Sequence, residues 1–180
     1  MNGDDFIEME KRAFAILDKL TKPDRDRFKK YFPKTDDITL IILKGHLLIE
    51  EQLNGLIEVM VRSPEVLFQD KRLFTFYQKL MLVESLSGKS NTNLDSIWLN
   101  IEKINEIRNK LAHKLDIPEL EDKIDKFINP RSEPFRCKSS EERIEKLEER
   151  FFIMHTILSS MKHSLLIVNK KINKLGKATI

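Results

Sequence analysis

The stretch that most constrains the fold runs from Ser139 to Lys174 and contains neither glycine nor proline. Its apolar residues recur in alternating steps of four and three, which places them on one side of an α-helix. At its start, Ser139 and Glu142 have the spacing of a capping box. The stretch therefore predicts one long amphipathic helix with these apolar positions: Leu147, Phe151, Met154, Leu158, Met161, Leu165 and Val168.

The rest of the chain also has helical spacing, and no segment shows a strand pattern. Only five glycines and six prolines interrupt it, which favours long helices with short connections. Asp36 or Asp37 is suited to cap the third helix. Helices are predicted over residues 4–20, 24–32, 37–62, 70–85, 93–114 and 118–127. Together these elements predict an all-α bundle.

Three local features refine these expectations. Pro23 is expected to separate the first two helices, because proline lacks the N–H that a helix interior needs. Gly45 and Gly55 lie inside the third helix, where glycine costs about 1 kcal/mol relative to alanine, and predict close packing of a neighbour. The spacing of the fourth helix predicts inward side chains at Leu73, Phe76, Tyr77, Leu80 and Met81.

Length and composition bound the class of protein. The 180 residues fit one domain, which we divide into an N-terminal helical extension (1–35) and a helical bundle (36–180). The net charge of +3 permits contact with a polyanion without requiring it. The single cysteine, Cys137, has no partner for an internal disulfide, which favours the cytoplasm. No run of about 18 uninterrupted apolar residues predicts a membrane span, and the acidic N-terminus does not resemble a secretory signal.

The segment "EIRNKLAHKL", which begins at Glu106, carries the residues with the clearest chemical potential. On a helix, Arg108, Asn109 and His113 share one face, with the smaller Asn105 and Ala112 between them. The opposite face is apolar and predicted to meet the core, through Ile97, Ile104, Ile107, Leu111 and Leu115. The outward face is therefore polar, partly uncharged and suited to cover by a partner.

The Arg-to-His spacing alone is weak evidence for a site. A second pair with the same spacing, Arg150 and His155, encloses only apolar residues, and we interpret it as polar positions flanking a core-facing segment. A solvated helix end also explains His113, since a cation there complements the helix dipole.

Context adds to the spacing, because "INEIRNKLAH" resembles the signature of the HEPN superfamily. Arg108, Asn109 and His113 match that signature in type and order. The resemblance covers residues 38–166 and implies a HEPN-like bundle of long antiparallel helices. Residues 76–116 also resemble the mannitol-repressor-like branch of related helical proteins. Toxins of the HepT type carry a tyrosine two residues after the histidine, where this chain has Leu115, so regulation by nucleotidylation of such a tyrosine is not expected.

Metal-free RNA cleavage needs a base for the ribose 2′-hydroxyl, an acid for the leaving 5′-oxygen and a cation for the transition state. Histidine suits both proton transfers, and the arginine fork matches phosphate oxygens. Because each chain supplies one motif His113 and one Arg108, a two-fold dimer would complete the set, with Asn109 orienting the histidine or the phosphate. The resemblance implies the same composite cleft.

We therefore expect a metal-independent endoribonuclease without a cofactor, a homodimer that acts on RNA as a toxin or anti-phage effector. An antitoxin or other regulatory protein would restrain it. The alternatives are a non-catalytic regulator of the mannitol-repressor-like kind and a helical protein-interaction module.

Weaker candidates surround this motif. Arg131, Arg136 and Lys138 lie in a loop that either tracks an RNA backbone or is simply solvated. Glu50 or Glu51, on a neighbouring helix, is a candidate to support Arg108. Asn105, on the same helix as Arg108, is another.

The remaining titratable residues are expected to be structural. His46 and Glu50 are one helical turn apart and are interpreted as a hydrogen-bonded surface pair, not as part of a metal site. His163 is expected to be exposed, and Cys137 has no nearby histidine to make it a nucleophile.

Overall fold

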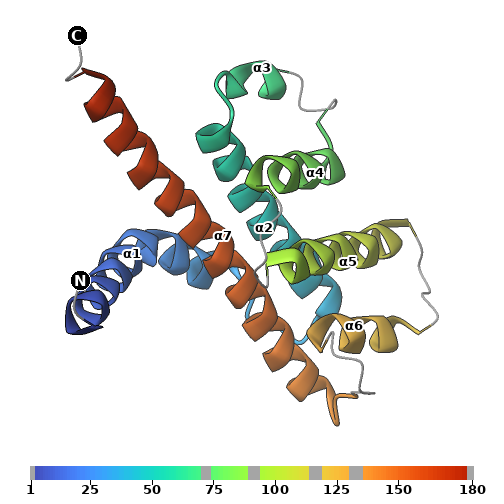
Figure 1. Cartoon of the computed structure of the whole chain (residues 1–180). Helices are drawn as coiled ribbons and strands as arrows, with labels where there is room; N and C mark the ends of the chain where they lie inside the picture. The colour runs from blue at the N-terminus through green and yellow to red at the C-terminus, as the bar shows by residue number, and fades with distance from the viewer. Residues whose placement is uncertain (1–2, 70–73, 89–93, 114–118, 130–135, 178–180) are drawn as a thin grey trace.

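The computed structural model describes residues 3–69, 74–88, 94–113, 119–129 and 136–177. Its described residues form helices and no strand, which confirms the all-α bundle. The helices are α1 (Gly3–Tyr31), α2 (Ile38–Met60), α3 (Pro64–Phe68), α4 (Phe76–Ser87), α5 (Leu94–His113), α6 (Leu120–Ile128) and α7 (Ser140–Lys177). Helices α2 and α7 cross at the centre, with α1 on one side and α4, α5 and α6 on the other (Figure 1).

The two central helices run in the same direction. Gly45 of α2 lies against Phe151 of α7, and further along Gln52 contacts His155, so residue numbers rise together along both helices. Helix α1 instead runs antiparallel to α7, since Phe28 packs on Phe152 while the earlier residue Asp24 bonds to Ser159. The antiparallel arrangement expected of the bundle is therefore wrong for its central pair, and the helix that is antiparallel to α7 here is α1, in the predicted N-terminal extension.

Helix α7 packs closely on α2 at Gly45, as the sequence predicted for this glycine. A Cβ added there would lie 2.5 Å from the ring of Phe151, which has no exposed surface. The rings of Phe32 and Phe127 also pack on Phe151, with centroids 5.9 and 5.7 Å away. A side chain at position 45 would therefore require Phe151 to shift within a packed core.

We expect Gly45→Ala to lower the free energy of unfolding by about 1–2 kcal/mol, because overpacking a filled core outweighs the gain in helix propensity. Urea denaturation measures this change. Gly55→Ala is the matched control, since its Cβ would meet the flexible chain of Lys162 at 3.0 Å instead of a buried ring. Equal stability of the two variants would show that Phe151 does not limit the approach.

The expected break at Pro23 is wrong, because α1 continues through it from Gly3 to Tyr31. Proline lacks the N–H that would bond to the carbonyl of Lys19, four residues earlier. Nearby, the Thr21 hydroxyl donates to the carbonyl oxygens of Leu17 (2.9 Å) and Asp18 (3.2 Å), and Arg25 Nη2 also donates to that of Asp18 (3.2 Å). A proline inside a helix bends it without necessarily ending it, and α1 curves along its length (Figure 1).

The caps of the later helices follow local chemistry. Asp37 caps α2 by accepting from the backbone N–H of Leu40 at 3.0 Å, as predicted. Helix α4 starts later than predicted, at Phe76, because Thr75 and Gln78 form a capping box. Phe76 and Leu80 are buried in the core, as predicted. Tyr77 and Met81 are exposed, so the prediction that their side chains face inward is wrong. Leu73 lies outside the described residues.

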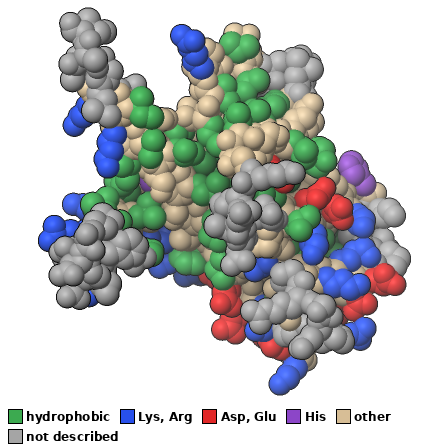
Figure 2. Space-filling view, viewed as in Figure 1, with side chains coloured by type: hydrophobic (Ala, Val, Ile, Leu, Met, Phe, Trp, Pro, Cys, Tyr) green, Lys and Arg blue, Asp and Glu red, His purple; other side chains and the backbone are tan. Residues whose placement is uncertain are grey.

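The surface divides into two kinds of region. Hydrophobic side chains gather over the upper half of α7 and over α2, α3 and α4, whereas charged side chains of both signs gather over α5 and α6 (Figure 2). Within Ser140–Ile172 of α7, a stretch with mean hydropathy 1.4 is long and apolar enough to cross a membrane by composition alone, and 28% of it is buried. One such helix is weak evidence for a membrane span, because core helices have the same character.

Candidate functional site

Helix α5 presents the motif on its outer face. Its inner face is fixed by residues with at most 4% exposure: Ile97, Ile101, Ile104 and Ile107. On the opposite side Asn109, Ala112 and His113 are exposed, and Arg108 is partly buried. The helical position predicted from the sequence is therefore confirmed for the described part of this face. Leu115 lies outside the described residues.

Arg108 is oriented by its neighbour in the chain. Its Nη1 donates to Oδ1 of Asn109 at 3.1 Å. The amide that was expected to orient His113 or a phosphate thus holds the guanidinium in this conformation. His113 forms no hydrogen bond with any described residue, so its imidazole is available to a partner or a ligand.

A buried histidine lies behind this face. His46 is 3% exposed, its Nε2 is 3.1 Å from Oδ1 of Asn105, and its ring stacks on Phe76 with centroids 4.0 Å apart. Burial, aided by the charges of Arg108 and Lys79, lowers the pKa of His46. The imidazole is therefore neutral near pH 7 and donates from Nε2 to the Asn105 oxygen. This bond joins α2 to α5 one turn before Arg108.

Two expectations about the neighbouring carboxylates are wrong. His46 is buried and bonded to Asn105, so it is not half of a surface pair with Glu50. Glu50 instead pairs with Lys79 at 2.7 Å, and Glu51 pairs with Arg27. Neither carboxylate hydrogen-bonds to Arg108 in the described part of the chain. Asn105, the third residue expected to support the motif, bonds to His46 behind it.

The basic loop is only partly within the described residues. Arg131 lies outside them. Arg136 is 80% exposed and 3.3 Å from Asp122, while the Lys138 side chain is exposed and its backbone N–H donates to Glu142 at 2.7 Å. Burial and the nearby Asp125 carboxylate raise the pKa of the Cys137 thiol to about 11, so the thiol is protonated and unsuited to nucleophilic attack.

No family model, curated protein or solved structure matches this chain.

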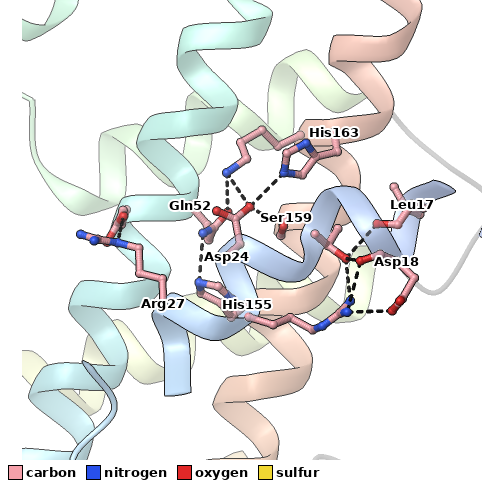
Figure 3. A network of polar contacts seen from close by, with 12 residues as sticks. Leu17, Asp18, Asp24, Arg27, Gln52, His155, Ser159 and His163 are labelled. Atoms are coloured by element: carbon pink, nitrogen blue, oxygen red, sulfur yellow. Dashed lines mark hydrogen bonds and ion pairs between the residues drawn. The ribbon is translucent and has the colours of Figure 1, made fainter. Parts of the chain in front are cut away.

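A polar cluster that the sequence did not predict joins three helices (Figure 3). Oδ2 of Asp24 on α1 accepts from the Ser159 hydroxyl at 2.6 Å and lies 2.8 Å from Nζ of Lys162 and 3.1 Å from Nε2 of His163. His163 is therefore partly buried, and the expectation that it is exposed is wrong. The Ser159 and His163 side chains both bind the same carboxylate oxygen, and Ser159 is fully buried, so they do not form a nucleophilic relay.

The cluster continues to His155, the histidine of the second Arg-to-His pair in the sequence. Lys162 Nζ donates to Oε1 of Gln52 at 3.3 Å, and Nε2 of Gln52 is 3.0 Å from Nε2 of His155. His155 is 1% exposed, and burial lowers its pKa to about 4, so it is neutral and accepts from the glutamine. Nε of Arg150 is buried without a hydrogen-bond partner. The pair thus serves packing, as its apolar surroundings predicted.

We expect the free energy of unfolding to fall by on the order of 2 kcal/mol as the pH drops from about 6.5 to about 4. The unfolded chain takes up a proton on His155 in this window, whereas the native state does not until its lowered pKa of about 4 is reached. Denaturant titrations at several pH values measure the slope. His155→Gln keeps a hydrogen-bonding side chain but does not titrate, so its slope should be smaller; equal slopes would contradict the prediction.

Among the described residues, no group of three His, Cys, Asp or Glu side chains is arranged to hold a metal ion.

A second buried ion pair, Arg143 with Asp125, joins α7 to α6 through contacts of 2.9 and 3.3 Å. Its two members are 5% and 2% exposed, so it positions the helix that follows the motif.

Proposed function

We propose that this protein is a metal-independent endoribonuclease of the HEPN type. The observation that carries the proposal is the outer face of α5, where Asn109, Ala112 and His113 are exposed and Arg108 is held by Asn109. The His113 imidazole has no hydrogen-bond partner among the described residues, and with the oriented guanidinium on the other side of a small alanine it leaves space for a phosphate group. The sequence resemblance to the HEPN signature at these residues supplies the reaction.

The chemistry requires two copies of this face. One imidazole removes the 2′-hydroxyl proton, the second protonates the leaving 5′-oxygen, and the two guanidinium groups stabilise the charge on the phosphate. Asn109, Ala112 and His113 are exposed on this side of α5, so a two-fold axis beside it would join both sets. The proposal therefore includes a homodimer with a composite active site.

Residues behind the face contribute rigidity. The bond between His46 and Asn105 fixes α5 against α2 one turn before Arg108, which limits the motion of the guanidinium. In the cell, we propose that the enzyme is a cytoplasmic toxin or anti-phage effector kept inactive by an antitoxin or other regulatory protein.

The direct test is incubation of the purified protein with RNA in EDTA. Attack by the 2′-hydroxyl leaves a 2′,3′-cyclic phosphate on one product and a 5′-hydroxyl on the other, and mass spectrometry distinguishes these ends from those of metal-dependent hydrolysis. Size-exclusion chromatography with light scattering measures the oligomeric state in the same buffer. A monomer that cleaves RNA would contradict the composite site.

A non-catalytic regulator or protein-interaction module is the second candidate, and one observation favours it. Basic groups beside α5 are matched by acidic ones: Arg136 lies 3.3 Å from Asp122, and Lys123 lies 3.5 Å from Glu119. A surface of mixed sign attracts RNA less than a uniformly basic one. A purified dimer that neither cleaves nor binds RNA would support this second function.

A further inference from the structure

A cavity away from the α5 face lies between α2, α3 and the start of α4. Its volume is about 610 Å³, within the range of small-molecule sites. Glu50, Asn54 and Glu58 line it from α2, one helical turn apart, and Lys79 lines it from α4. The residues of the α5 motif do not line it, so the cavity is separate from the proposed active site.

Aromatic rings form the apolar wall. Phe68 and Phe74 meet edge to face with centroids 6.1 Å apart, and Phe76 lines the cavity as well as stacking on His46. Because His46 and the core fix Phe76, this part of the wall is rigid. Aromatic faces carry negative potential and attract cations within about 6 Å of the ring centre.

Lys79 is the one positively charged side chain among the described residues that line the cavity, and it already has a partner. Lys79 Nζ lies 2.7 Å from Glu50, so its charge is balanced within the wall. At the start of α4, the backbone N–H of Gln78 bonds to the Thr75 side chain, and the N–H of Thr75 bonds to the Gln78 side chain. An anion would therefore find few free donors here.

The unmatched groups are acceptors. Glu58 is exposed and has no ion-pair partner among the described residues. Asn54 lines the same cavity, and its Oδ1 is buried without a hydrogen-bond partner among the described residues.

We infer that this cavity binds an organic cation that carries N–H donors, an alkylguanidinium or alkylammonium group. The alkyl part would lie against Leu67, the cationic head against Phe68 and Phe74, and its N–H groups would donate to Glu58. The same head group occurs in free amines and in arginine or lysine side chains of other proteins, and the experiment separates these sources.

Isothermal titration calorimetry of the full chain tests this inference with n-butylguanidinium and with its neutral counterpart n-butylurea. We expect a Kd of about 1 mM or tighter for the cation, typical of a small fragment, and at least about tenfold weaker binding of the urea. Equal affinities, or no heat from the cation at tenfold higher concentration, would overturn the proposal. N-Acetylarginine amide is the second probe; tighter binding than n-butylguanidinium indicates a protein side chain as the source, and weaker binding indicates a free amine.

Two variants link the binding to the cavity. Glu58→Gln is expected to weaken cation binding about tenfold, because a hydrogen bond to a charged group is lost. Glu65→Gln on α3 removes the same charge from an exposed residue that does not line the cavity, and should leave the Kd unchanged. Phe68→Leu keeps the wall apolar but removes the ring, so it should also weaken binding. If Glu58→Gln and Glu65→Gln change the Kd equally, the cation is attracted only by the overall negative charge, and the inference is overturned.

Discussion

Replacing Arg108 or His113 with alanine is expected to lower the rate of RNA cleavage by at least about 100-fold, because in the proposed mechanism each substitution removes a group used only in the transition state. The fold should survive, since His113 is exposed and Arg108 bonds only to its exposed neighbour Asn109 among the described residues. Surface substitutions of this kind usually change stability by less than about 0.5 kcal/mol. Single-turnover cleavage and thermal unfolding of each variant measure the two effects separately.

Two controls match these variants. Lys103→Ala removes a cation from an exposed position on the same helix, five residues before Arg108, and should retain nearly full activity. Mixing inactive His113→Ala protein with wild type tests the composite site. If both copies are needed, the activity should fall with the square of the wild-type fraction once subunits exchange. Full activity of both alanine variants would leave the α5 face with a binding role instead.

Periodicity predicted the helices and the orientation of α5 because both depend on residues close in sequence. The core face of Ile97, Ile104 and Ile107 repeats at helical spacing, so the opposite face with Asn109 and His113 followed directly. Pro23 shows the limit of local rules. Helix α1 is packed on α7 through Phe28 and Asp24, and local propensity does not include such contacts.

The errors inside the candidate site have a common physical cause. His46 and Glu50 are neighbours on one helix, but the stronger partner of His46 is Asn105, 59 residues away. Glu50 is likewise paired with Lys79, 29 residues away. The partner of a side chain on a helix depends on how the other helices pack against it, and a single sequence carries no signal for that packing. The same holds for Asp24 and Ser159, which are 135 residues apart.

Asp24→Ala is expected to lower the free energy of unfolding by about 3 kcal/mol, because removing one partner of a buried charge pair leaves the other uncompensated. Asp24 and Lys162 side chains are each 17% exposed, so water replaces the lost carboxylate only in part. The substitution also leaves the Ser159 hydroxyl and the His163 ring without their acceptor. Urea denaturation at pH 7 measures the change.

The same carboxylate predicts a second signature at low pH. Burial alone would raise the pKa of Asp24, but hydrogen bonds from Lys162 and Ser159, the charge of Lys162 and the hydrogen bond from His163 outweigh it and lower the pKa to about 2. The unfolded value is higher, near 3.8, so the contribution is complete above that pH and is lost as the pH falls through about 2. The gap corresponds to about 2 kcal/mol. The stability difference between wild type and Asp24→Ala should therefore shrink in this window.

Asp18→Ala is the matched control for Asp24→Ala. Asp18 lies on the same helix and is 2.7 Å from Arg25, but its side chain is 73% exposed. Exposed pairs contribute about 0–1 kcal/mol, because water solvates both charges when the pair is broken. A large difference between the two variants would show that the Asp24 cluster anchors α1 to α2 and α7. If both variants lose equally little stability, the packing of the α1 phenylalanines alone holds this helix in place. The cluster then only provides hydrogen-bond partners for polar groups that the packing has buried.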